Sequence, residues 1–280
     1  AMILTEDTER VGISQLASRL IAQVSAPYAV DGEDLVIGLS VGIAVAPING
    51  TRPDQILRNA DLALYRAKEQ GGNRFCFFEN RMDADVRERR MLELELGEAL
   101  DHNEFELYYQ PVINAGDGTV SGFEALIRWN HPIRGLVPPS GFIPISERSS
   151  LIGRIGEWTI HEACRMLARL PERYTVAVNL SAKHFRTADI AALLERALEE
   201  TGVAPHRLEL EITESLLIDN PEEMALKLHQ LKGAGIKIAM DDFGTGYSSL
   251  SYLLKFPFDK IKIDRSFVTA SSEDSNAREI

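Results

Sequence analysis

The sequence contains few cysteines. Cys76 and Cys164 are the only two among its 280 residues, and they lie too far apart to suggest a disulfide framework. Stable disulfides mark oxidising compartments, so this pattern favours a reduced, cytoplasmic setting. A longer parent protein could still be anchored in a membrane through segments outside this sequence. We expect both thiols to be small, buried hydrophobic groups.

Long hydrophobic runs and an excess of basic residues are lacking as well. The longest apolar run, Leu35–Ile48, is interrupted by Gly38 and Gly42 and is too short to span a bilayer. It predicts a core strand. The chain has 30 Lys and Arg against 42 Asp and Glu, a net charge of -12, which argues against binding a nucleic-acid polymer through a basic face. An anionic ligand would therefore need a metal ion or local cations.

The composition is that of a folded protein with two domains. Hydrophobic residues make up 45% and charged residues 26% of the chain, and 280 residues exceed the usual size of one domain. The opening "AMILTEDTER" has no initiator Met at its first position, so we expect an excerpt of a longer protein. Apolar periodicity and charge predict a partial α/β domain over residues 1–78, a solvated linker helix over 79–102 and a second domain over 103–280.

Strand-like and helix-like runs alternate in the second domain. The strand-like runs are "FELYYQPVI", "VSGFEALIRW", "TVAVNLS", "RLELEIT", "IKIAMDD" and "FDKIKID". Repeated strand-then-helix order predicts a parallel sheet with helical crossovers, either a doubly wound sheet or a (β/α) barrel. A turn at Asp117 and Gly118 predicts that the first two strands form an antiparallel hairpin. Six strands with polar ends favour an eight-stranded barrel that is incomplete, a choice that also rests on the resemblance below.

Each strand after the first carries polar side chains near its C-terminal end. These residues are Glu124, Arg128, Asn179, Glu211, Asp241, Asp242 and Lys262. In a parallel barrel such strand ends converge on one face. The adjacent carboxylates of Asp241 and Asp242 repel each other unless a cation neutralises them. An all-oxygen donor set suits Mg²⁺ or Mn²⁺ better than zinc. Glu209 shares a strand face with Glu211 and could pair inside the barrel.

Several motifs together resemble the EAL phosphodiesterases, which hydrolyse cyclic di-GMP. They are "EALIRW" from Glu124, "VNLS" from Val178, "EITES" from Glu211, "DDFGTGYSSL" from Asp241 and "KIDRSF" from Lys262. The match runs in order over about residues 92–270. Residues 1–78 resemble the C-terminal half of a GGDEF diguanylate cyclase domain, through "SVGIAV" and "ADLALYRAKEQGGN". The chain is therefore similar to a tandem GGDEF-EAL protein, with an EAL-type (β/α)8 barrel truncated after about six strands.

The resemblance implies a role for each matching residue. Metal ligands would be Glu124, Asn179, Glu211 and Asp241, with Asp242 a ligand of a second Mg²⁺ or Mn²⁺ ion. Glu124, Asp242 and Lys262 would be catalytic, with Lys262 holding the attacking water or the phosphate. Arg128 and Leu126 would contact the substrate, and Glu214 would steady the loop that begins at Asp241. The product would be linear pGpG, and dimerisation through the barrel and an upstream sensory domain are implied as well.

Some parts that the resemblance implies do not occur in this sequence. A seventh-strand glutamate and a late glutamine near the guanine site are absent, and so is the GGDEF signature. We therefore expect no cyclase activity from residues 1–78 and an incomplete enzyme over 103–280. Two alternatives stay open for the parent protein: a non-catalytic cyclic di-GMP receptor, which binds the dinucleotide and signals through the linker helix, and a protein that is chiefly a cyclase.

Overall fold

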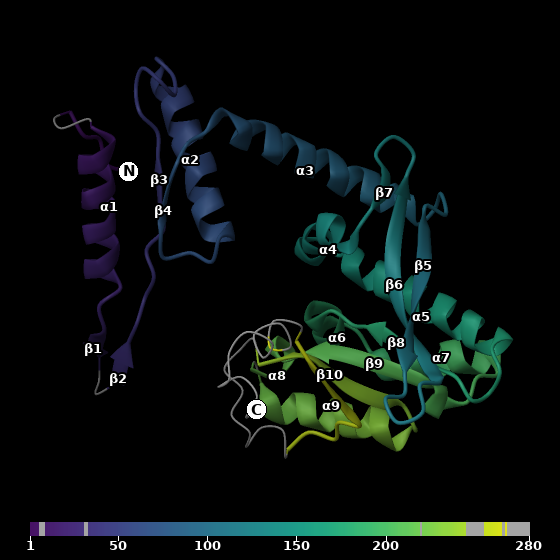
Figure 1. The fold of residues 1–280 in the computed structure, drawn as a ribbon. Coiled ribbons are helices and arrows are strands. Elements are labelled where there is room, and N and C mark those ends of the chain that lie inside the picture. The colour runs from purple at the N-terminus through teal and green to yellow at the C-terminus, as the bar shows by residue number, and fades with distance from the viewer. Residues whose placement is uncertain (6–8, 31–32, 219, 245–254, 265–266, 268–280) are drawn as a thin grey trace. The chain divides into compact units, whose positions relative to one another are not determined.

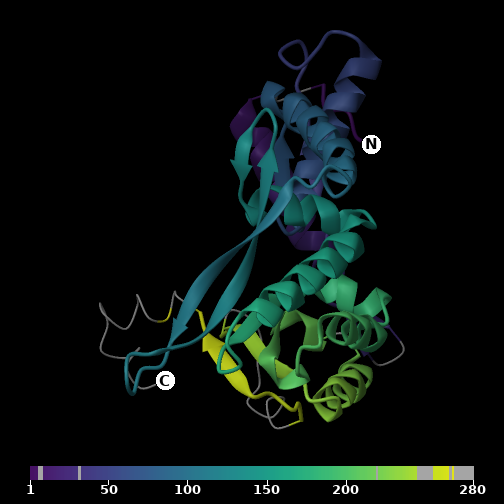
Figure 2. The same ribbon diagram turned by 90° about the vertical axis from the view of Figure 1, so that its right-hand side faces the viewer.

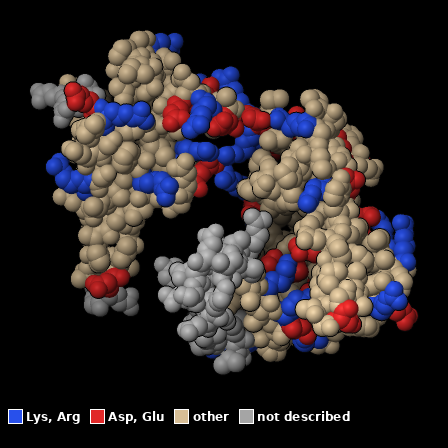
Figure 3. Space-filling view, in the orientation of Figure 1, with Lys and Arg blue, Asp and Glu red and all other residues tan. Residues whose placement is uncertain are grey.

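A computed structural model gives the fold (Figure 1), and it describes residues 1–5, 9–30, 33–218, 220–244, 255–264 and 267. The chain divides into two compact units, Ala1–Met91 and Leu92–Ile280. Over the described residues, no helix combines the length and apolar character needed to cross a membrane. On the face that Figure 3 shows, Lys and Arg side chains are interspersed with Asp and Glu side chains.

The first unit is built from short strands, two complete helices and the first turns of a third. Its elements are α1 (Arg10–Val24), β1 (Tyr28–Val30), β2 (Glu33–Leu35), β3 (Val41–Ile43), α2 (Pro53–Glu69) and β4 (Phe75–Phe77). β1 and β2 pair antiparallel, and β3 pairs with β4 in parallel. The apolar side of α2 buries Ala63 and Ala67, and positive φ angles at Gly71 and Gly72 follow its end.

The predicted strand over Leu35–Ile48 differs from what is observed. Leu35 ends β2, and Val41–Ile43 forms β3 in a different sheet. A run of apolar residues shows only that a segment can be buried, whereas a strand extends only as far as its hydrogen-bonded partner. Gly42 allows β3 to approach α2 closely, because a Cβ at Gly42 would lie 2.0 Å from the carbonyl oxygen of Ala60 in α2.

A long helix, α3 (Asn80–Ala99), contains the point at which the chain divides into its two units. Its last turns belong to the second unit, where Leu96 and Ala99 are buried in an aromatic cluster with Phe105, Trp129 and Phe142. Polar contacts reinforce this packing. His131 lies 3.0 Å from Glu95 of α3, and the indole nitrogen of Trp129 donates to Glu104.

The second unit contains a mixed sheet, visible in Figures 1 and 2. Its strands are β5 (Phe105–Ile113), β6 (Val120–His131), β7 (Gly135–Val137), β8 (Thr175–Asn179), β9 (Leu208–Thr213), β10 (Lys237–Phe243) and β11 (Lys260–Ile263). The order is β11-β10-β9-β8-β6-β5, with β7 on β6. β5 and β6 form the predicted antiparallel hairpin, and β6 to β11 pair in parallel through β8, β9 and β10. All six predicted strands are present, and over the described residues the sheet is not closed.

Helices connect β6 to β8, β8 to β9 and β9 to β10, and they cover one face of the sheet. They are α4 (Pro139–Arg148), α5 (Leu151–Arg169), α6 (Ala182–Thr187), α7 (Ile190–Thr201), the 3-10 turn η1 (Pro205–Arg207), α8 (Ser215–Ile218) and α9 (Pro221–Gly233). α7 begins at an Asp189 cap, whose carboxylate accepts from the amide of Ala192, and ends at left-handed Gly202. Cys164 of α5 is buried in this core, where burial raises the pKa of its thiol to about 12.

Strand β9 shows how the fold positions polar groups. Leu208, Leu210 and Ile212 belong to the core formed with the helices, and their burial stabilises the sheet at roughly 25 cal/mol per Å² of apolar surface. Successive side chains on a strand point to opposite faces, so Glu209 and Glu211 lie on the face away from the helices. Both are only 3% exposed. The inner face of the sheet therefore holds buried charge that needs partners.

Candidate functional site

Three carboxylates meet around one ammonium group on the inner face of the sheet. Nζ of Lys262 donates to Oε2 of Glu211 at 2.6 Å, Oε2 of Glu124 at 3.1 Å and Oδ2 of Asp241 at 3.2 Å. The four side chains come from β11, β9, β6 and β10, as the convergence of parallel strand ends predicts. We call Glu124, Glu211, Asp241 and Lys262 the carboxylate cluster.

Asn179 adjoins this cluster at the end of β8. Its Nδ2 donates to Oε1 of Glu124 at 2.9 Å, and its backbone lies in register with Glu211. The amide of Leu180 donates to the carbonyl of Glu211 at 2.9 Å and holds the chain just beyond Asn179. The Asn179 side chain thus lies beside the carboxylate of Glu124.

The cluster holds more negative charge than its one ammonium can neutralise. Burial raises the pKa of Glu211 to about 7; the hydrogen bond and charge of Lys262 oppose the shift, and the charges of Glu124 and Asp241 add to it. Burial alone would lower the pKa of Lys262, but its hydrogen bonds and charge interactions with Glu211 and Glu124 outweigh burial and raise that pKa above its usual value. The site therefore favours an added positive charge, either a proton or a cation.

The excess negative charge and the donor atoms of the cluster show whether a divalent cation fits there. The donors are carboxylate and amide oxygens, which suit Mg²⁺ or Mn²⁺. Within the described ranges, no group of three or more His, Cys, Asp and Glu side chains has the spacing of a formed metal site. The carboxylates gather around the Lys262 ammonium instead. The donor atoms and the charge of these residues fit a hard cation. The Lys262 ammonium binds the same carboxylate oxygens that would hold the cation.

The two adjacent aspartates have different surroundings. Asp241 reaches Lys262, whereas Asp242 is exposed and has a left-handed φ of 56°, which Asp tolerates better than most residues. The pairing of β10 with β11 is irregular between Met240 and Phe243, which turns the chain at this point. Burial, followed by the charge of Asp241, raises the pKa of Asp242. Only one member of the pair thus belongs to the carboxylate cluster.

The two residues predicted to contact substrate follow Glu124 along β6. Leu126 and Arg128 are half-buried and alternate with Ala125 and Ile127, so they share the strand face of Glu124. The Arg128 guanidinium lies 5.4 Å from the ring centre of Tyr108, which is opposite Leu126 in β5. Tyr108 was not predicted from the sequence, because the alternation of "FELYYQPVI" by itself does not distinguish a cation–π partner from an ordinary strand residue.

Glu214, predicted to steady a loop, is buried just after β9. It is 6% exposed, and neither carboxylate oxygen has a hydrogen-bond partner among the described residues. Most of the loop in question, residues 245–254, lies outside the described residues. The role predicted for Glu214 stays a prediction.

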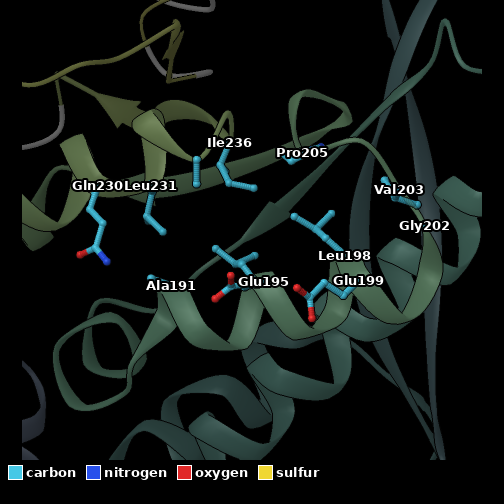
Figure 4. Close-up of a pocket in the computed structure, with 12 residues that line it drawn as sticks. Ala191, Glu195, Leu198, Glu199, Gly202, Val203, Pro205, Gln230, Leu231 and Ile236 are labelled. Atoms are coloured by element: carbon cyan, nitrogen blue, oxygen red, sulfur yellow. The ribbon is translucent and has the colours of Figure 1, made fainter.

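A separate groove of about 520 Å³ lies between α7 and α9 (Figure 4). Its floor contains Leu194, Leu198, Leu231 and Ile236, which belong to the core on the helix side of the sheet. The groove is therefore on the opposite side of the sheet from the carboxylate cluster. Its lining is mostly apolar and includes no residue of the cluster, so the charged chemistry belongs to the inner face.

Two family models match the chain in succession. The model described as diguanylate cyclase, GGDEF domain, matches residues 1–74, and the EAL domain model matches residues 93–280. The EAL match covers well over half of the chain and contains every residue of the carboxylate cluster together with Asn179, Arg128 and Glu214.

Curated relatives are similar over nearly the whole chain. A protein of Pseudomonas aeruginosa named bifunctional diguanylate cyclase/cyclic di-GMP phosphodiesterase MucR is 39% identical over 98% of this chain and 41% of its own length. An uncharacterised signalling protein of Caulobacter vibrioides is 47% identical over 91% of this chain and 32% of its own length. The chain thus spans about a third to two fifths of the length of these relatives.

A solved structure described as a MucR phosphodiesterase in complex with c-di-GMP has the same fold as part of the chain. It is 39% identical, with a TM-score of 0.65, and the match covers 68% of this chain and 78% of the solved one. The resemblance inferred from the sequence motifs, a GGDEF domain followed by an EAL domain, is confirmed.

Proposed function

Because this chain belongs to the EAL domain family, we propose that its carboxylate cluster is the active site of a metal-dependent phosphodiesterase that hydrolyses cyclic di-GMP to linear pGpG. The observation that carries the proposal is the convergence of Glu124, Glu211 and Asp241, from three strands, on a single cationic centre at Lys262. The name of the MucR relative and the ligand of the solved MucR structure support the choice of substrate.

The cluster suits the charge changes of phosphodiester hydrolysis. A water oxygen forms a bond to phosphorus, one ester P–O bond breaks, and the leaving 3′-oxygen takes up a proton, which opens the ring to a linear dinucleotide. A divalent cation bound there supplies positive charge that polarises the phosphate and lowers the pKa of water. Glu124, Asn179, Glu211 and Asp241 would hold one Mg²⁺ or Mn²⁺ ion, and Asp242 would contribute to a second.

The other residues bind and orient the substrate in this proposal. Lys262 already lies among the acidic side chains, where its ammonium would donate a hydrogen bond to the attacking water or to a phosphate oxygen. Arg128 shares a strand face with Glu124 and would contact a phosphate oxygen, while Leu126 between them would give apolar contact to the nucleotide. Glu214 would steady the loop that follows Asp241.

We also propose the wider organisation that the motifs imply. Residues 1–78 would be the C-terminal half of a GGDEF domain, 79–102 the linker helix and 103–280 the EAL domain. α3 occupies most of the proposed linker, and its last turns pack against Phe105 of β5 and Trp129 of β6. The parent protein would be cytoplasmic or anchored in a membrane elsewhere, with an upstream sensory domain and a dimer formed through the EAL domain.

The decisive experiment compares turnover with binding in the full-length protein. With Mg²⁺ or Mn²⁺, the wild type should convert cyclic di-GMP to pGpG, and Glu124→Gln should reduce turnover at least about 100-fold, the effect of removing one element of preorganised electrostatics. Nucleotide binding should largely persist, because Arg128 is unchanged. Glu195→Gln, at an exposed position of α7, is the matched control and should keep wild-type turnover. Tight binding by the wild type without hydrolysis in either metal would establish the receptor alternative instead.

A further inference from the structure

A second ion pair lies directly beside the carboxylate cluster. Nζ of Lys260 donates to Oε1 of Glu209 at 2.6 Å, and Glu209 is 3% exposed. The two glutamates of "LELE" in β9 thus each bind one of the two lysines of "KIK" in β11, across the intervening strand β10. The period of two in both strands places the four charges on the inner face.

The backbone register alone does not determine that Lys260 pairs with Glu209. Ala239 of β10 is in register with Glu211 on one side and with Lys260 on the other, so Lys260 begins level with Glu211 and not with Glu209. Its side chain nevertheless leans toward the amino ends of the strands and binds Glu209. A flexible lysine at this level could otherwise place its ammonium against Glu211.

We propose that Glu209 is a positioning residue that holds Lys260 away from the carboxylate cluster, so that only the ammonium of Lys262 shares its oxygens. The inference rests on the proposed function, in which the cluster holds a divalent cation. Without Glu209, the ammonium of Lys260 would turn to Glu211 and neutralise the negative charge of that carboxylate. Two positive charges a few ångströms apart repel strongly at a partly buried site, so cation binding would weaken.

The test measures Mn²⁺ binding to the full-length protein without nucleotide, by the electron paramagnetic resonance signal of free Mn²⁺. Glu209→Met removes the acceptor and should raise the Mn²⁺ dissociation constant at least about tenfold. The double variant Glu209→Met with Lys260→Met replaces the pair by apolar groups, a change that proteins often tolerate. It should restore Mn²⁺ binding to within about threefold of wild type, because no second ammonium remains.

Recovery of Mn²⁺ binding in the double variant distinguishes a positioning role of Glu209 from a role in packing alone. A double variant that binds Mn²⁺ as weakly as Glu209→Met, or a Glu209→Met protein with wild-type affinity, would overturn the inference and leave the proposed function standing. A wild type that binds no Mn²⁺ would overturn both. Thermal unfolding checks that each variant is folded. If Glu209→Met is not folded, Glu209→Gln takes its place, because it keeps an amide oxygen that can accept from Lys260. Glu209→Gln should lose less Mn²⁺ affinity than expected for Glu209→Met, and adding Lys260→Met should again reverse the loss.

Discussion

Nζ of Lys262 lies 2.6 Å from Oε2 of Glu211, and this contact joins β11 to β9 across β10. Glu211 is almost completely buried, so its ionised form depends on this ammonium for compensation. Glu124 and Asp241 bind the same nitrogen. The stability of this part of the sheet is therefore linked to pH, to Lys262 and to any cation that the cluster binds.

The pKa of Glu211 predicts a pH-dependent stability in the cation-free protein. Burial raises this pKa from 4.5 to about 7. Between these values the folded protein holds a proton that the unfolded chain has lost, so the contribution of Glu211 to the free energy of unfolding falls as pH rises, by at most about 1.4 kcal/mol per pH unit. Urea unfolding of wild type and Glu211→Gln across this range measures it. The difference between the two proteins should change with pH; a constant difference would contradict the assignment.

Removing the ammonium should make folding depend on an added cation. Lys262→Met leaves three neighbouring carboxylates without their shared partner, which should lower the cation-free unfolding free energy by roughly 3 kcal/mol. Saturating Mg²⁺ should stabilise this variant more than wild type, since binding to the folded state alone adds stability and no ammonium competes. Thermal unfolding with and without Mg²⁺ gives both values. Equal Mg²⁺ effects in the two proteins would show that Lys262 does not compete for the site.

Two glycines of α5 should respond in opposite directions to the same substitution. A Cβ at Gly156 would lie 2.2 Å from Nδ1 of the buried His184, so Gly156→Ala should cost about 1 to 3 kcal/mol through overpacking. At Gly153 the nearest His184 atom is 3.8 Å away. Gly153→Ala should therefore be stabilising by up to about 1 kcal/mol through helix propensity. Denaturant unfolding measures both, and similar effects at the two positions would rule out the contact with His184 as the cause.

Arg207 should be a strong determinant of stability away from the site. Its guanidinium donates to the carbonyls of Leu170, Pro171 and Tyr174 between 2.9 and 3.1 Å, and the residue is 7% exposed. Arg207→Met removes all three hydrogen bonds that the buried guanidinium donates and should cost about 2 to 4 kcal/mol. Arg196, whose contact with Glu157 is 3.9 Å long and exposed, is the control, and Arg196→Ala should change stability by less than about 0.5 kcal/mol. Comparable losses would contradict this account.

The sequence predicted most elements of the second unit because their patterns are local. "FELYYQPVI" and "VSGFEALIRW" alternate around a turn with Asp117 and Gly118, which is enough to form β5 and β6 as a hairpin. The 3.6-residue periodicity of α5 and α7 is equally visible in the chain. The run from Leu35 was different, because its division between β2 and β3 depends on strand partners that no local pattern specifies.

The sequence by itself determined which acidic side chains share a face along the parallel strands, since strand periodicity places Glu124, Glu211 and Asp241 on inward faces. Only the tertiary structure decided which charges meet. The register of β9, β10 and β11 brings Lys262 among those three carboxylates, pairs Lys260 with Glu209, and leaves Asp242 on an exposed left-handed turn. The physical reason is that hydrogen bonds and ion pairs act over about 3 Å, a distance that only the packed sheet sets between residues as far apart in sequence as Glu124 and Lys262.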